Sequence, residues 1–151
     1  MTPERFHDIL LELLDENPFA VRSVLKLLRT EYTDAVPTLA ITCEAQPSLL
    51  VNLDFISRTC ASDAHVKAVI CHEFLHLLLR HTEKRSPLTF AEHIAMDAVI
   101  NAIIHRQHGE AYSGMMAAYY KDAKGVMRLL RPPAKGDRES LTGKRDRKAH
   151  V

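Results

Sequence analysis

The first third of the chain shows two helical hydrophobic patterns in succession. Over residues 3–16, apolar residues recur at the i, i+3, i+4, i+7, i+8 spacing that places them on one helix face: Phe6, Ile9, Leu10, Leu13 and Leu14. A second run with similar spacing follows Asn17 and Pro18, which end the first. We therefore predict that residues 1–35 form a helical hairpin that serves as a structural layer.

The hydrophobic period changes after Pro37. Thr38–Thr42 and Leu49–Leu53 are short runs typical of β-strands, and Ala45–Ser48 between them has the composition of a turn. These three segments predict a small antiparallel hairpin.

A long apolar helix is predicted next, from about Ala64 to His81, with Ser62 or Asp63 as its N-cap. Apolar residues cover much of its circumference, whereas a surface helix would have one apolar stripe. This pattern indicates a central, buried helix.

A second long helix is predicted from Thr89 to about Gln107. Thr89 and Glu92 fit a capping box, and Gly109 suits the C-terminal stop. Residues 110–133 continue the helical pattern with a stripe of methionine and tyrosine. We expect this stripe to belong either to the core or to a surface that meets a partner protein.

Together these elements predict a single α+β domain over residues 1–133, mostly helical, with a small antiparallel sheet beside the first long helix. The helical hairpin of residues 1–35 precedes a central part, 36–109, which holds the strands and both long helices. A C-terminal helix over 110–133 completes the domain. Residues 134–151 are rich in charge and poor in apolar groups, so we expect a disordered basic tail that could contact an acidic partner.

Composition narrows the classes of partner and compartment. The 151 residues carry a formal net charge of +1. Proteins that bind nucleic acid usually present a strongly basic surface to the phosphates, so we do not expect nucleic acid as a ligand. No apolar run reaches the roughly 18 residues of a membrane span, and the N-terminus lacks the apolar core of a signal peptide. Cys43, Cys60 and Cys71 lack metal-site spacing, so we interpret them as reduced thiols of a cytoplasmic protein.

The first long helix contains an H-E-x-x-H motif formed by His72, Glu73 and His76. Residues four apart share a helix face, so both histidines can hold one metal ion with Glu73 beside them. Zinc hydrolases use this arrangement, in which the carboxylate acts on a metal-activated water. Because a polar cluster within an apolar helix must be paired or bind something, we predict Zn²⁺ as the cofactor.

A catalytic zinc ion normally has three protein ligands, so a third is needed. Asp97 lies within a strongly apolar stretch of the second long helix, where an unpaired carboxylate would be costly. We predict His72, His76 and Asp97 as ligands, with His93, one turn earlier, as the alternative third ligand. Asn101, one turn later, is expected in the layer behind the ligands. The competing interpretation is that Asp97 only hydrogen-bonds to a site histidine.

The two motif-bearing segments resemble a known family. Val69–His81 and Ile94–Asn101 are similar to the metallopeptidase domain often found with von Willebrand factor A domains, which has an H-E-x-x-H helix, an arginine-histidine pair and an A-x-D-x-x-I-N helix. The resemblance covers roughly residues 36–104. It implies a zincin-like fold and an acidic third ligand from the second helix, which corresponds to Asp97.

The favoured hypothesis is therefore a zinc metallopeptidase that cleaves a peptide or protein substrate. Glu73 would accept a proton from water and pass it to the leaving amine. We expect Leu49–Leu53 to be an edge strand that holds an extended peptide by strand addition. His105, His108 and Tyr112 are the candidate donors to the carbonyl oxygen.

Two other functions remain open from the residues. Endoribonucleases that mature ribosomal RNA carry an H-x3-H-x5-H motif; His72, His76 and His81 fall one residue short of it, and Glu73 replaces a glycine. A non-catalytic zinc-containing interaction module would show four protein ligands, or no metal at all.

Overall fold

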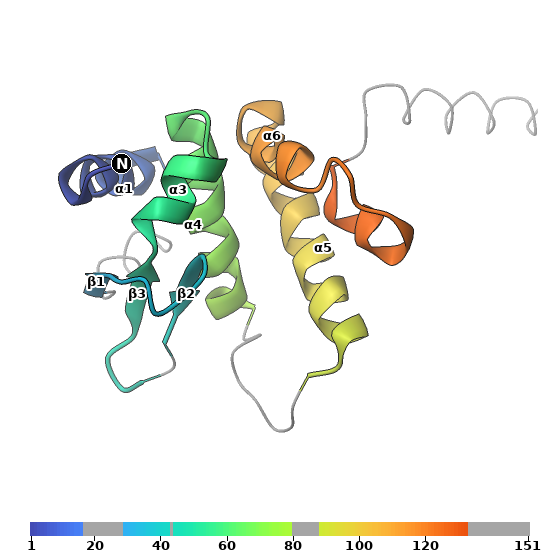
Figure 1. The fold of residues 1–151 in the computed structure, drawn as a ribbon, viewed down its shortest axis with the longest axis horizontal. Coiled ribbons are helices and arrows are strands. Elements are labelled where there is room, and N and C mark those ends of the chain that lie inside the picture. The colour runs from blue at the N-terminus through green and yellow to red at the C-terminus, as the bar shows by residue number, and fades with distance from the viewer. Residues whose placement is uncertain (17–28, 43, 80–87, 133–151) are drawn as a thin grey trace, which may run out of the picture.

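The structure, a computed structural model, describes residues 1–16, 29–42, 44–79 and 88–132 (Figure 1). In chain order its elements are α1 (Pro3–Glu16), β1 (Arg29–Tyr32), β2 (Leu39–Ile41), β3 (Ser48–Val51), α3 (Leu53–Thr59), α4 (Asp63–Leu78), α5 (Phe90–His108), α6 (Glu110–Tyr119) and the 3-10 helix η1 (Gly125–Leu130). The protein is therefore α+β and mostly helical, as predicted, with one small sheet in the described part.

The sheet is mixed, with the strand order β1-β3-β2. Strand β2 pairs antiparallel with β3, which confirms the predicted hairpin. Strand β1 pairs parallel with β3 on its other side, from Arg29 opposite Ser48 to Tyr32 opposite Val51. The expectation that Leu49–Leu53 forms an edge strand is therefore wrong, because β3 is the central strand. The residues from Leu53 onward form helix α3.

The N-terminal segment agrees only in part with the predicted helical hairpin. Helix α1 is present, and its five apolar residues at helical spacing are all buried. The predicted second helix falls on residues outside the described ranges. Residues 29–32, which the hairpin of 1–35 included, form β1 instead. Their sequence, RTEY, is mostly exposed and lacks an apolar alternation, so it carried no hydrophobic signal for a strand.

Helix α4 is the centre of the fold, as its apolar pattern predicted. It packs against α1, β2, α5 and α6, and Figure 1 shows it between the sheet and α5. Ser62 is its N-cap: the hydroxyl oxygen accepts a hydrogen bond from the His65 N–H at 3.2 Å. Lys67 is buried on α4, and Glu12 and Glu16 of α1 neutralise its charge, with the Glu16 contact at 2.7 Å.

Helix α5 begins and ends as predicted. The Thr89 hydroxyl accepts a hydrogen bond from the Glu92 N–H at 3.2 Å. Gly109 has a φ of 74°, a left-handed conformation that glycine adopts readily, so the chain turns directly into α6.

The single C-terminal helix predicted over residues 110–133 is broken in two. Helix α6 ends at Tyr119, and η1 begins only at Gly125, whose φ of 62° is incompatible with a continuous right-handed helix. Met115 and Met116 are buried, so they belong to the core rather than to a partner-facing surface. The basic tail lies outside the described residues.

Two further expectations concern cysteines and membrane spans. Cys60 and Cys71 are free thiols, as predicted, while Cys43 lies outside the described residues. None of the described helices has the length and apolar composition needed to cross a membrane.

Candidate metal centre

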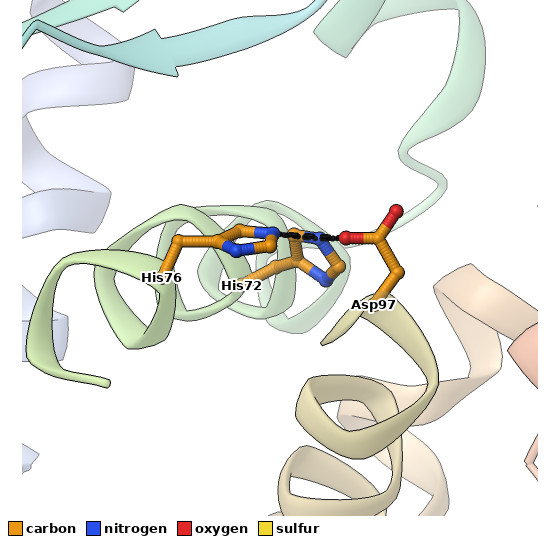
Figure 2. A group of neighbouring side chains, drawn as sticks. All are labelled: His72, His76 and Asp97. Atoms are coloured by element: carbon orange, nitrogen blue, oxygen red, sulfur yellow. Dashed lines mark hydrogen bonds and ion pairs between the residues drawn. The ribbon is translucent and has the colours of Figure 1, made fainter. Parts of the chain in front are cut away.

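Helices α4 and α5 lie side by side and bring His72, His76 and Asp97 together. The two histidines follow one another by a single turn of α4, and Asp97 extends toward them from α5 (Figure 2). All three side chains are partly buried, with 18%, 19% and 30% of their side-chain surface exposed.

The atoms that face one another are those that bind metals. Nε2 of His72 lies 3.2 Å from Oδ1 of Asp97, and Nε2 of His76 lies 2.9 Å from the same oxygen. The two Nε2 atoms are 3.2 Å apart. Ligands of a tetrahedral zinc ion at bond lengths of about 2.1 Å are about 3.4 Å from one another. The three atoms therefore fit the coordination of a single ion.

Asn101 determines which nitrogen of His72 is available to a metal. Its side-chain amide donates a hydrogen bond to the Leu130 carbonyl at 3.0 Å, and a carbonyl can only accept. Its Oδ1 therefore faces Nδ1 of His72, at 2.7 Å, and that nitrogen must be the donor. A neutral His72 then has its lone pair on Nε2, the atom that points at Asp97.

This arrangement has a physical consequence. A lone pair on Nε2 of His72 repels the carboxylate oxygen of Asp97, so a proton or a metal ion must lie between them. Asn101 is only 2% exposed, as expected of a residue that orients a metal ligand from behind. Asn101 therefore lies behind His72, on the side of the ring opposite Asp97.

The ionisation of the cluster reflects the same contacts. Burial opposes the charge on His72, but the hydrogen bond with Asp97 and the negative charge of Glu73 together raise its pKa. Burial also opposes the charge on Asp97, but hydrogen bonds with both histidines hold its pKa well below the usual range. Protons and a metal ion therefore compete for one electronegative position.

Glu73 shares a pocket of about 200 Å³ with the metal-ligating groups. The pocket is lined by residues of the two long helices and of neighbouring elements: Thr38, Phe55, Val69, His72, Glu73, His76, Asp97, Asn101, Met115, Met116, Tyr119 and Tyr120. Burial raises the pKa of Glu73, although the nearby histidines partly offset the effect. The pocket therefore combines a candidate metal centre with a candidate proton acceptor.

His93, the alternative third ligand, is not part of this cluster. It lies on α5 one turn before Asp97, but its side chain is exposed. The group of metal-ligating atoms within 4.8 Å of one another contains His72, His76 and Asp97, among the residues that the structure describes.

None of the three predicted donors to the carbonyl oxygen lines the pocket. His105 is hydrogen-bonded to Ser113 at 2.7 Å, and the ring of His108 stacks on Tyr112. The Tyr112 hydroxyl donates to Glu16 at 3.0 Å. These expectations were wrong: His105 and His108 belong to α5 and Tyr112 to α6, but none of their side chains lines the pocket.

Tyr120 is the pocket residue that the sequence did not single out as a candidate donor. It follows the last residue of α6, and its pKa is raised to about 12 by burial and by the negative charges of Asp97 and Glu73, among others. The phenol therefore stays protonated and can donate a hydrogen bond. Its only sequence signal was membership of the methionine and tyrosine stripe.

Comparisons with known proteins identify no relative of this chain. A scan against protein-family models finds no match, and searches of curated proteins and of solved structures find no significant match either.

The choice of third ligand can be tested by zinc titration against a competing chelator. Asp97→Ala should weaken zinc binding by more than about 100-fold, because it removes a ligand rather than a supporting residue. His93→Ala should bind zinc as the unchanged protein does, since its side chain is exposed. Loss of affinity in His93→Ala, or its retention in Asp97→Ala, would contradict this assignment.

The orienting role of Asn101 predicts a weaker effect in the same titration. Asn101→Ala should lower zinc affinity by about 10- to 100-fold, because His72 loses the acceptor that fixes its tautomer. Ser113→Ala is the matched control: it removes another buried partner of a histidine, His105, away from the metal-ligating group. Equal zinc affinities of the two variants would show that Asn101 does not orient the ligand.

Proposed function

We propose that the protein is a zinc-dependent hydrolase, a zincin-like metallopeptidase that cleaves peptide bonds. The observation that carries this proposal is the convergence of His72, His76 and Asp97 from two helices, in one pocket with Glu73. The resemblance of the two helix motifs to the metallopeptidase domain associated with von Willebrand factor A domains points the same way.

The residues of the chain have separate tasks in this proposal. His72, His76 and Asp97 would hold the zinc ion, which would supply an acidified water and polarise the substrate carbonyl. Glu73 accepts the proton that the water loses as its oxygen bonds to the carbonyl carbon. Glu73 then delivers that proton to the amine nitrogen as the carbon–nitrogen bond breaks. Among the described residues, none donates a hydrogen bond to the Glu73 carboxylate, which leaves it free to act on water.

Tyr120 is the side chain best placed to stabilise the carbonyl oxygen as it gains negative charge. It lines the pocket, and its hydroxyl has no hydrogen-bond partner in the part of the chain that the structure describes. A protonated phenol aimed at a developing oxyanion is an established form of electrostatic catalysis.

The strand that would hold an extended peptide is β2. It pairs with β3 along one edge only, within the described ranges, and it packs against α4. Thr38, directly before β2, lines the pocket. An open strand edge beside the site supports binding of a peptide by strand addition, the task first expected of Leu49–Leu53.

The two alternative functions receive less support. The ribonuclease-like motif depends on His81, which lies outside the described residues. An interaction module built on structural zinc needs four protein ligands, whereas the group found in the described ranges has three. A position left for water favours a catalytic ion.

The role of Glu73 can be tested with Glu73→Gln. This variant should bind zinc as tightly as the unchanged protein and lose hydrolysis of an unfolded protein substrate, because an amide cannot accept the water's proton. Glu92→Gln, at an exposed position of α5, is the control and should keep full activity. The assay includes a chelator arm, in which activity should disappear. Full activity of Glu73→Gln would contradict the assignment of Glu73 as the proton acceptor.

The role of Tyr120 predicts a selective loss of turnover. Tyr120→Phe should reduce kcat by about 10²- to 10³-fold, the usual cost of removing one oxyanion donor, with little change in zinc affinity. Tyr112→Phe removes the same hydroxyl from α6 outside the pocket and should leave kcat unchanged. Similar kcat values for the two variants would rule out Tyr120 as the donor.

A further inference from the structure

The pocket that holds the metal-ligating residues is lined by both polar and apolar side chains. Helices α4 and α5 supply the two histidines and both carboxylates. The apolar lining residues, called the apolar wall below, come from three elements, α3, α4 and α6: Phe55, Val69, Met115, Met116 and Tyr119. The first four are at most 7% exposed, so they form a packed surface continuous with the core.

The described lining includes no lysine or arginine. Its acidic groups are Glu73 and Asp97, and their two negative charges equal the positive charge of one zinc ion. The loaded pocket would therefore have no net charge to attract a charged side chain. A charged group placed against Phe55 and Met116 would lose its hydration without gaining a partner.

The size of the pocket limits what its apolar side can hold. An apolar cavity of about 150 Å³ is large enough for benzene. The pocket has a volume of about 200 Å³, part of which belongs to the metal centre. The remaining space suits one large aliphatic or aromatic side chain. Met115 and Met116 are flexible and polarisable, so they can adapt to several apolar shapes.

Tyr119 occupies a different position in the wall. It is 49% exposed, and its ring meets Phe55 edge to face, with ring centroids 6.0 Å apart. It is therefore the most solvent-exposed of the five residues of the apolar wall.

We propose that this apolar wall is a specificity subsite that accepts a large apolar side chain flanking the bond to be cleaved. The substrates are extended polypeptides with leucine, methionine or phenylalanine at that position. This inference rests on the proposed peptidase function, because the subsite has meaning only beside a reacting bond. The residues that determine specificity are Phe55, Val69, Met115 and Met116.

The first test maps cleavage sites. The zinc-loaded full chain is incubated with casein as an unfolded protein, and the new termini are identified by mass spectrometry. At one of the two positions flanking the cleaved bonds, large apolar residues should be enriched over charged residues by about tenfold or more, the discrimination that pocket contacts typically give. The Glu73→Gln variant provides the background of contaminating cleavage.

The second test changes the shape of the subsite. Met116→Ala enlarges it and should shift the preference from leucine toward phenylalanine and tryptophan by about tenfold. Met127→Ala, a methionine of η1 that does not line the pocket, is the matched control and should keep the original preference. Because Met116 is buried, Tyr119→Ala serves as a second variant at a half-exposed position, and it should also favour larger side chains. Zinc stoichiometry confirms that each variant is folded.

The outcomes separate the two proposals. Cleavage without any residue preference, or a preference unchanged in folded Met116→Ala and Tyr119→Ala, overturns the subsite and leaves the peptidase intact. Enrichment of charged residues at both flanking positions also overturns it. Absence of zinc-dependent cleavage by the unchanged protein overturns the peptidase and the subsite together.

Discussion

The contact of Asp97 with His72 and His76 is the interaction on which the rest of the site depends. Three electronegative atoms lie within 3.2 Å of one another between two otherwise apolar helices. Such a cluster is destabilising unless a cation or protons lie among the atoms, so its geometry makes sense as a metal centre. The contact depends on the spacing of α4 and α5, because a shift of either helix would separate the three atoms.

The scaffold holds this contact from several sides. Asn101 links His72 to the carbonyl of Leu130, so the 3-10 helix η1 takes part in orienting a ligand 58 residues earlier in the chain. On another side of α4, the buried Lys67 is neutralised by two glutamates of α1. The central helix is thus tied to both ends of the described chain by polar contacts within a mostly apolar core.

Different elements supply the chemistry and the proposed selectivity of the pocket. Helices α4 and α5 contribute the metal-ligating groups and Glu73, whereas α3 and α6 contribute most of the apolar wall. Tyr120 follows α6 directly and lines the same pocket. The negative charges of Asp97 and Glu73 contribute to its raised pKa. In the proposed peptidase, substitutions in α6 would therefore change substrate preference and leave the proposed zinc ligands in place.

The sequence by itself determined the local features of this protein. Helical periodicity placed His72, Glu73 and His76 together, and the cost of a carboxylate in an apolar helix favoured Asp97 over His93 as the third ligand. Only the tertiary structure decided which strand is central, which tyrosines line the pocket and where the three expected donors lie. These features depend on contacts between segments far apart in the chain, such as β1 with β3 and α6 with α4, and local hydrophobic patterns carry no information about them.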